Sequence, residues 1–369
     1  MEVENISSSL RGSDSEVGLE EMGDDALDRD ARIKLSIGTK EYGDADGQFH
    51  VPRGLVFDHH RGLLLAVDSN NHRVQSFSCD DGGSFVSKLG EQGSQPGQLS
   101  CPYGVAIDHD HDRILVTDSG NHRVQAWSLN EQSFLSCIGQ KGSGELEFFN
   151  PRGIAIDKHH RRIIIIDTFN HRLVFLSSID LSFLFEVGKN GKQPGDFRYP
   201  SGIAIDHERH RIIVCDTNNH RVQVLSSIDG SFLFMFGEEG EQPGQLIYPH
   251  GVCVDNQGRI VVADHRLQAF THEGHHISSL ECGREKIFGV AFDEHRGLIA
   301  FSADNRVHVI GANQWLADTF TWRVDRHRYA PSWIKQAVST MTMIRSLVDE
   351  CSAMSMIPNE LLFEIFSFL

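Results

Sequence analysis

The chain has 369 residues, of which 40% are hydrophobic and 23% charged, as in an ordinary globular protein of one large or two smaller domains. Its formal net charge of −17 argues against general nucleic-acid binding, because neutralising phosphates requires clustered lysines and arginines. The seven cysteines are odd in number and never form a Cys-x-x-Cys pair, which disfavours a disulfide framework and most zinc modules.

Residues 1–30 carry ten acidic side chains against Arg11 and Arg29, and they include few large apolar residues. Such a segment cannot bury enough surface to order itself, so we predict a disordered acidic tail. No basic start precedes an apolar run, and the longest run of Ile, Leu and Val alone is Ile163 to Ile166. We therefore expect neither a signal peptide nor a membrane span, and a cytoplasmic or nuclear protein that is not secreted.

A unit of about fifty residues repeats along the chain. The pattern Pro-x-Gly begins at Pro52, Pro102, Pro151, Pro200 and Pro249, and a sixth unit lacks the proline but keeps "FGVAFD" at 288–293. Within the fourth unit, 200–237, turns separate the short runs "GIAID", "RIIVCD", "RVQVL" and "SFLFMF", which predict one four-stranded antiparallel sheet per unit. Radial packing of six sheets buries their faces, so we predict an all-β, six-bladed β-propeller over residues 31–312.

A propeller has to close its ring. The segment "RIKLSIG" at 32–38 matches the pattern of the fourth strand in each unit, and the loop after it has the form of the linkers between units. We expect this N-terminal strand to complete the sixth blade. The alternative closing segment is "WLADTFTW" at 315–322.

The sequence Asp-x-x-Asn-His-Arg occurs four times, beginning at Asp68, Asp118, Asp167 and Asp216, where each aspartate ends a second strand and each arginine starts a third. Asparagine suits turns and arginine binds carboxylates, and copies on the outer part of a ring cannot converge on one ligand. We therefore expect Asp, Asn and Arg to tie each turn to itself or to the next blade, the alternative being a ring of His and Arg that binds a partner.

A second set of histidines, including His59, His60, His109, His159 and His160, lies in the turns between first and second strands on the opposite face. We expect polar hairpins there, with pH sensitivity or adventitious metal binding as alternatives.

The repeated pattern Pro-x-Gly-h-Ala-h-Asp, followed by Asp-x-x-Asn-His-Arg, resembles the NHL repeat, whose family folds as a six-bladed β-propeller. The match is strongest in units one to four, roughly residues 50–237. Unit five departs with "VVADHRLQAF" and unit six with "FSADNRVHVI". Some propellers that resemble this one are lyases or hydrolases with a channel metal, and some animal NHL proteins bind RNA.

Recognition is expected at positions that vary inside the constant frame. The residues between proline and glycine should rim the central channel, and Phe169 and Asn218 occupy turns between second and third strands on the same face. The predicted partner-binding face comprises Arg53, Tyr103, Arg152, Phe169, Ser201, Asn218 and His250. Because the rim offers only His250 as a metal ligand, and nucleophile and phosphate-loop motifs are missing, we expect no enzyme, catalytic residue, metal or cofactor. A channel-metal lyase or hydrolase and a single-stranded RNA binder are the alternatives.

Residues 313–369 are predicted to form a small α-helical C-terminal extension. The end, "IPNELLFEIFSFL" at 357–369, resembles the start of an F-box, in which Pro358, Leu361, Leu362 and Ile365 would begin the surface that docks an adaptor of a cullin ubiquitin ligase. Together, the two modules predict a protein-interaction scaffold, and more specifically the substrate-recognition subunit of such a ligase.

Overall fold

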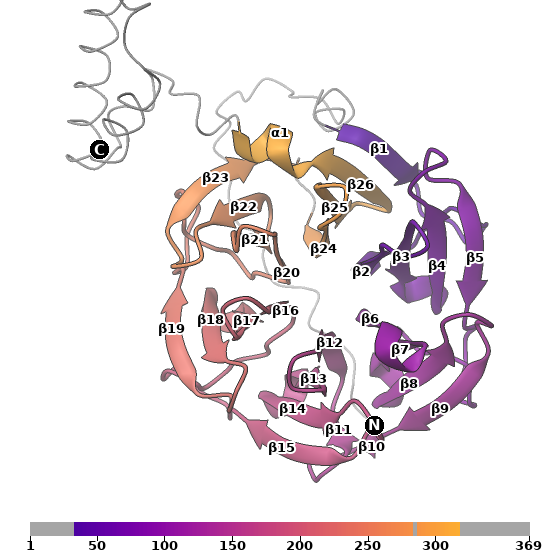
Figure 1. The fold of residues 1–369 in the computed structure, drawn as a ribbon, viewed down its shortest axis with the longest axis horizontal. Coiled ribbons are helices and arrows are strands. Elements are labelled where there is room, and N and C mark those ends of the chain that lie inside the picture. Colours follow the sequence, from indigo (N-terminus) through magenta and orange to yellow (C-terminus); the bar gives the residue numbers. More distant parts are fainter. Residues whose placement is uncertain (1–32, 283–285, 318–369) are drawn as a thin grey trace, which may run out of the picture. The chain divides into compact units, whose positions relative to one another are not determined.

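The computed structural model describes residues 33–282 and 286–317, which form a ring of six four-stranded antiparallel sheets (Figure 1). In each sheet, or blade, the first strand lies at the central channel and the last strand lies outermost. The predicted all-β, six-bladed propeller is therefore confirmed. No helix among the described residues is long and apolar enough to cross a membrane. The acidic tail, the F-box-like segment and the predicted helical extension beyond Ala317 lie outside the described residues.

The blades follow one another in chain order, except that the sixth takes its last strand from the start of the chain. Blade 1 consists of β2 (Pro52–Asp58), β3 (Leu63–Asp68), β4 (Arg73–Ser78) and β5 (Phe85–Leu89). Blade 2 consists of β6 (Val105–Asp108), β7 (Arg113–Asp118), β8 (Arg123–Ser128) and β9 (Phe134–Ile138). Blade 3 consists of β12 (Pro151–Asp157), β13 (Arg162–Asp167), β14 (Arg172–Ser177) and β15 (Phe183–Val187).

The other three blades have the same plan. Blade 4 consists of β16 (Ile203–Asp206), β17 (Arg211–Asp216), β18 (Arg221–Ser226) and β19 (Phe232–Phe236). Blade 5 consists of β20 (Gly251–Val254), β21 (Ile260–Ala263), β22 (Leu267–Phe270) and β23 (His276–Leu280). Blade 6 consists of β24 (Ile287–Asp293), β25 (Leu298–Ala303), β26 (Arg306–Gly311) and β1 (Ile33–Gly38).

The linkers between blades are also regular. The linker from blade 2 to blade 3 folds back on itself as a short parallel pair, β10 (Gln140–Lys141) with β11 (Glu147–Phe148). Three other linkers form the same contact as a single parallel bridge. Each of five linkers inserts one fully buried apolar side chain, and these are Phe49, Leu99, Phe148, Phe197 and Leu246.

The core of the propeller consists of apolar layers between neighbouring blades. Middle strands such as β7 are buried along their whole length, whereas outer strands such as β9 alternate between half-buried and exposed residues. Six apolar clusters each combine side chains from two adjacent blades; one, for example, joins Val67 of blade 1 to Val116 and Trp127 of blade 2. Radial packing thus buries both faces of each sheet, as the repeat pattern predicts.

The ring closes through β1, which pairs antiparallel with β26 in blade 6. Ile37 of β1 is buried in the layer between blades 6 and 1. Arg296 of blade 6 also forms an ion pair with Asp80 of blade 1, at 2.8 Å. The predicted N-terminal closing strand is confirmed. The alternative closing segment instead begins inside the short helix α1 (Ala312–Ala317), which packs Trp315 and Leu316 onto blades 5 and 6.

The five glycines of the Pro-x-Gly pattern, together with Gly289 of unit six, bring neighbouring inner strands into close contact. A Cβ at each of them would meet the carbonyl oxygen of the residue that precedes the matching glycine in the next blade. This series runs Gly54 to Tyr103, Gly104 to Arg152, Gly153 to Ser201, Gly202 to His250, Gly251 to Phe288 and Gly289 to Arg53. Because the last contact returns to blade 1, the inner ring closes after six steps, and each step requires a residue without a side chain.

Candidate functional site

The aspartate of each Asp-x-x-Asn-His-Arg motif is a buried hydrogen-bond acceptor that fixes the neighbouring linker. In blade 4, the carboxylate of Asp216 accepts bonds from the Arg198 backbone at 2.7 Å, Asn219 at 2.9 Å, Arg221 at 2.7 Å and Gln223 at 3.0 Å. The Arg221 guanidinium also donates to linker carbonyls, including that of Asp196 at 3.0 Å. In the four blades that carry the motif, its Asp, Asn and Arg therefore connect the blade to the linker before it, whereas the pattern predicted a tie within the turn or to the next blade.

The histidine of the motif connects each blade to the linker that follows it. It adopts a left-handed backbone after the short 3-10 helices η1 (Ser69–Asn71), η3 (Ser119–Asn121), η4 (Thr168–Asn170) and η5 (Thr217–Asn219). Its Nδ1 accepts the N–H of the residue before the next proline: His72 from Cys101, His122 from Asn150, His171 from Tyr199 and His220 from Tyr248. Those four donors all have positive φ, so the histidine holds a strained residue in place.

In blade 6 an asparagine makes the same connection. The Val51 N–H, again from a positive-φ residue before a proline, donates to Asn305 Oδ1 at 3.2 Å. The divergent sequence of unit six thus preserves the tie between blades with a different side chain. The interpretation of the motif as a structural element is confirmed, and the structure reveals the specific role of its histidine.

We expect His171→Ala to lower the free energy of unfolding by about 1–3 kcal/mol at neutral pH, because the Tyr199 N–H loses its acceptor. His171→Asn should lose less, since Asn305 accepts the equivalent bond in blade 6. Burial, reinforced by Arg198, lowers the pKa of His171 from the usual 6.5. The contribution of neutral His171 to the free energy of unfolding is therefore present above about pH 6.5 and is lost as the pH falls through the lowered pKa.

Denaturant titrations of the wild type and both variants across this pH range measure the effect. The difference between wild type and His171→Ala should shrink on acidification. A difference that grows as the pH falls would contradict the assigned bond.

On the same face, six side chains converge at the mouth of the central channel, one from the start of each inner strand. We call them the entrance ring: Arg53, Tyr103, Arg152, Ser201, His250 and Phe288. The Tyr103 hydroxyl reaches across from blade 2 to the Ser201 hydroxyl at 2.7 Å and lies 3.5 Å from His250 Nδ1. The cavity beneath them, lined in part by Tyr103, Ser201 and His250, measures about 70 Å³.

Two guanidinium groups lie over the aromatic members of the entrance ring. The Arg53 guanidinium carbon is 4.7 Å from the centre of the Tyr103 ring and 4.6 Å from that of Phe288, and Arg152 lies 5.0 Å from the Tyr103 ring. Within the described part of the chain, neither arginine takes part in a salt bridge. Burial lowers the pKa of His250 to about 3, and the positive charges of Arg152, Arg53 and Lys286 add to this effect. The mouth of the channel therefore carries positive charge with no matching carboxylate among the residues that the structure describes.

The predicted binding residues differ in how accessible they are. Arg53, Arg152 and His250 are half-buried, whereas Tyr103 is 7% exposed and Ser201 is 0% exposed. All five side chains lie around this mouth of the channel. The sequence pattern does not reveal that Tyr103 and Ser201 are buried there and bonded to each other.

Phe169 lies at a turn tip on the same face, and it is 36% exposed. Its ring contacts Phe149 at 5.1 Å and Tyr199 at 5.2 Å between centroids, and Lys141 Nζ lies 4.9 Å from the Phe149 ring. Phe149, Phe169 and Tyr199 form an aromatic stripe across the turn of blade 3 and the two linkers beside it. Asn218, in the equivalent turn of blade 4, is half-buried and donates its N–H to the Arg198 carbonyl oxygen.

Three residues of this face are absent from the predicted set. Phe288 occupies the x position of unit six, which lacks the proline, although aligning Gly289 with the other glycines would have found it. Phe149 and Tyr199 lie in linkers, one or two residues before a proline. Only the fold shows that these linkers reach the same turn as Phe169.

Comparison with known proteins agrees with this geometry. Three segments, residues 99–127, 197–225 and 246–270, match the NHL repeat. The chain contains NHL repeats. Each matched segment covers the end of a linker and the first three strands of a blade, in blades 2, 4 and 5. The curated proteins provide no match to the chain.

Solved structures share the fold at low sequence identity. A gluconolactonase from Xanthomonas campestris is 15% identical with a TM-score of 0.56, covering 73% of this chain and 87% of its own. A chain of a nidogen/laminin complex is 17% identical with a TM-score of 0.50, covering 65% and 84%. A protein of unknown function from Bacteroides thetaiotaomicron is 16% identical with a TM-score of 0.53, covering 74% and 73%. At these identities the likeness concerns the fold alone.

Proposed function

We propose that the propeller is a non-catalytic protein-interaction scaffold whose entrance ring binds an acidic segment of a protein partner. The observation that carries this proposal is the pair of half-buried guanidinium groups, Arg53 and Arg152, which have no carboxylate partner among the described residues. A guanidinium presents donors in a planar fork that matches a carboxylate, and stacking on aromatic rings holds that fork in place.

The surroundings of the two arginines suit a protein partner. The aromatic stripe around Phe169 offers exposed apolar area on the same face, and aromatic residues with arginine are typical of the energetic centre of an interface. The cavity beneath the entrance ring, about 70 Å³, is far smaller than a usual small-molecule site. Contact across the surface is therefore favoured over insertion of a substrate on this side.

A display library of short random peptides, selected on the full-length protein, tests the proposal. We expect the selected peptides to be rich in Asp and Glu, and we expect Arg53→Gln with Arg152→Gln to weaken their binding at least about tenfold. Arg161→Gln is the matched control, because Arg161 is exposed in a turn between first and second strands.

Peptides without acidic enrichment, or binding that survives loss of both arginines, would refute the proposed site. The proposed site would also be refuted if single-stranded RNA, added as a competitor, bound through these arginines in place of peptides.

In its more specific form, we propose that the scaffold delivers its bound partner to a cullin ubiquitin ligase. This form rests on the sequence of residues 357–369, through Pro358, Leu361, Leu362 and Ile365. Co-purification with a cullin adaptor should require this segment and should be lost on Leu361→Asp with Leu362→Asp. A clean purification that contains no cullin component would remove the ligase proposal and leave the scaffold proposal standing.

A further inference from the structure

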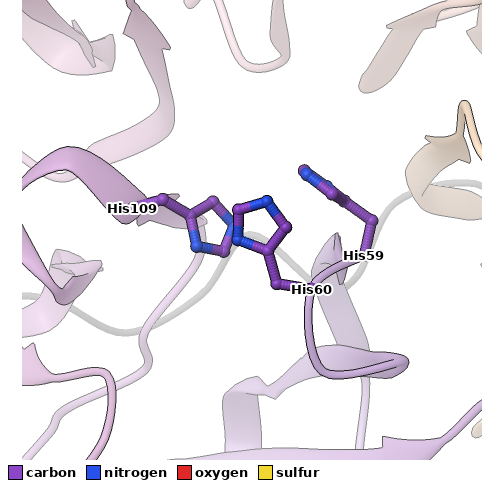
Figure 2. Close-up of side chains that lie close together, drawn as sticks. All are labelled: His59, His60 and His109. Carbon is purple, nitrogen blue, oxygen red and sulfur yellow. The ribbon is translucent and has the colours of Figure 1, made fainter.

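A cluster of histidines lies on the face opposite the entrance ring, at the wider mouth of the channel. His59 and His60 form the turn after β2, and His109 begins the 3-10 helix η2 (His109–His111) after β6. Figure 2 shows the three imidazole rings gathered between the turn of blade 1 and the neighbouring strand end of blade 2. His59 also stacks on His295 of blade 6, with ring centroids 4.6 Å apart.

The three histidines present ligand atoms at close range. Their rings lie 4.3 Å (His59 to His60), 4.2 Å (His60 to His109) and 5.3 Å (His59 to His109) apart between centroids. One nitrogen of each can be chosen so that all three lie within 4.8 Å of one another. The turns of inner strands converge at the channel, unlike the outer Asn-His-Arg turns, so adjacent repeats can share one ligand here.

Three other charged side chains lie near the histidine cluster. The buried carboxylate of Asp58 lies 3.8 Å from His109 Nε2, where its negative charge favours a bound cation. The positive charge of nearby Lys158 disfavours a bound cation, and the negative charge of nearby Glu294 favours one.

We propose that His59, His60 and His109 bind a late first-row divalent cation, with Zn²⁺ as the first choice, and thereby connect blade 1 to blade 2. Imidazole suits this class of metal, and three protein ligands leave a fourth tetrahedral position open. That position has solvent access, because His59 and His109 line a cavity of about 400 Å³ at this mouth of the channel. The site is independent of the proposed partner-binding face, and it departs from the expectation of no metal drawn from the sequence.

Calorimetric titration of Zn²⁺ into the chelator-treated, full-length protein near neutral pH tests the site. We expect one tight ion per chain, and we expect His59→Ala, His60→Ala and His109→Ala each to weaken binding at least about tenfold. The control is His159→Ala, since His159 occupies the equivalent turn of blade 3, where its ring lies 5.5 Å from His207 and from His210. Zinc should also raise the unfolding temperature of the wild type and the control.

Unfolding of the zinc-free variants establishes that each is folded, and exposed His60 offers the mildest substitution if the other two variants fail to fold. Undiminished binding in all three variants would overturn the proposal. Binding that is lost equally in the His159→Ala control would do the same. So would binding that depends on Glu294 and His295 but not on His60 and His109, because it would assign the ion to the other group of ligands around His59.

Discussion

Asp216→Ala is expected to lower the free energy of unfolding by about 3–5 kcal/mol, as measured by denaturant titration. The Asp216 side chain is fully buried and accepts four hydrogen bonds, one of them from the Arg221 guanidinium. Without this carboxylate, the buried and charged Arg221 guanidinium keeps, among the described residues, only carbonyl oxygens and the sulfur of Met235 as hydrogen-bond acceptors. The loss therefore combines an unpaired charge with broken bonds to the linker before blade 4.

Asp110→Ala is the matched control, because Asp110 is an exposed aspartate in η2. We expect it to change the free energy of unfolding by less than about 0.5 kcal/mol. Equal effects of the two substitutions would show that Asp216 does not hold blade 4 to its linker.

Gly289→Ala should destabilise the propeller by about 3 kcal/mol or more, because a Cβ at this position overlaps the carbonyl oxygen of Arg53. The clash lies between the inner strands of blades 6 and 1, where the ring closes. Neither backbone can move away easily, since β24 and β2 are each paired within their own blade. The ring has to open at this point or both inner strands have to shift.

Gly144→Ala provides the comparison for this glycine. The nearest atom to a Cβ at Gly144 is the end of the Glu147 side chain, 3.1 Å away, which can rotate aside. Thermal unfolding of both variants should therefore show a large loss for Gly289→Ala and a small one for Gly144→Ala. Comparable unfolding temperatures would mean that the inner ring tolerates a side chain and is packed less closely than described.

Local sequence signals were sufficient to predict the blades and their closure. Strand-length runs such as "RIIVCD" and the polar turns after Asp68 and Asp216 report on short-range structure, and both lie where expected. The match of 32–38 to a fourth strand predicted a contact between the two ends of the propeller, because its pattern had precedents inside the same chain. Repetition therefore supplied the long-range information that a single sequence usually lacks.

The composition of the site depended on contacts between blades, which the pattern does not encode. The bond from Tyr199 to His171 joins residues of different units, so neither unit alone reveals it. Phe288 was not predicted as a site residue because unit six lacks the proline used to count positions. The contact between His59 and His109 was not predicted because only the ring geometry brings the two polar turns together.

The residues that hold the blades together are distinct from those proposed to bind a partner, and one paired measurement tests that distinction most directly. Affinity for an acidic peptide selected on the wild type and the unfolding midpoint are measured for Arg53→Gln with Arg152→Gln, and for His171→Ala. We predict that the arginine variant loses at least about tenfold in affinity while its stability stays within about 1 kcal/mol of the wild type. We predict that His171→Ala loses stability and keeps its affinity. The reverse pattern, with binding lost at His171 and kept without the two arginines, would contradict the account.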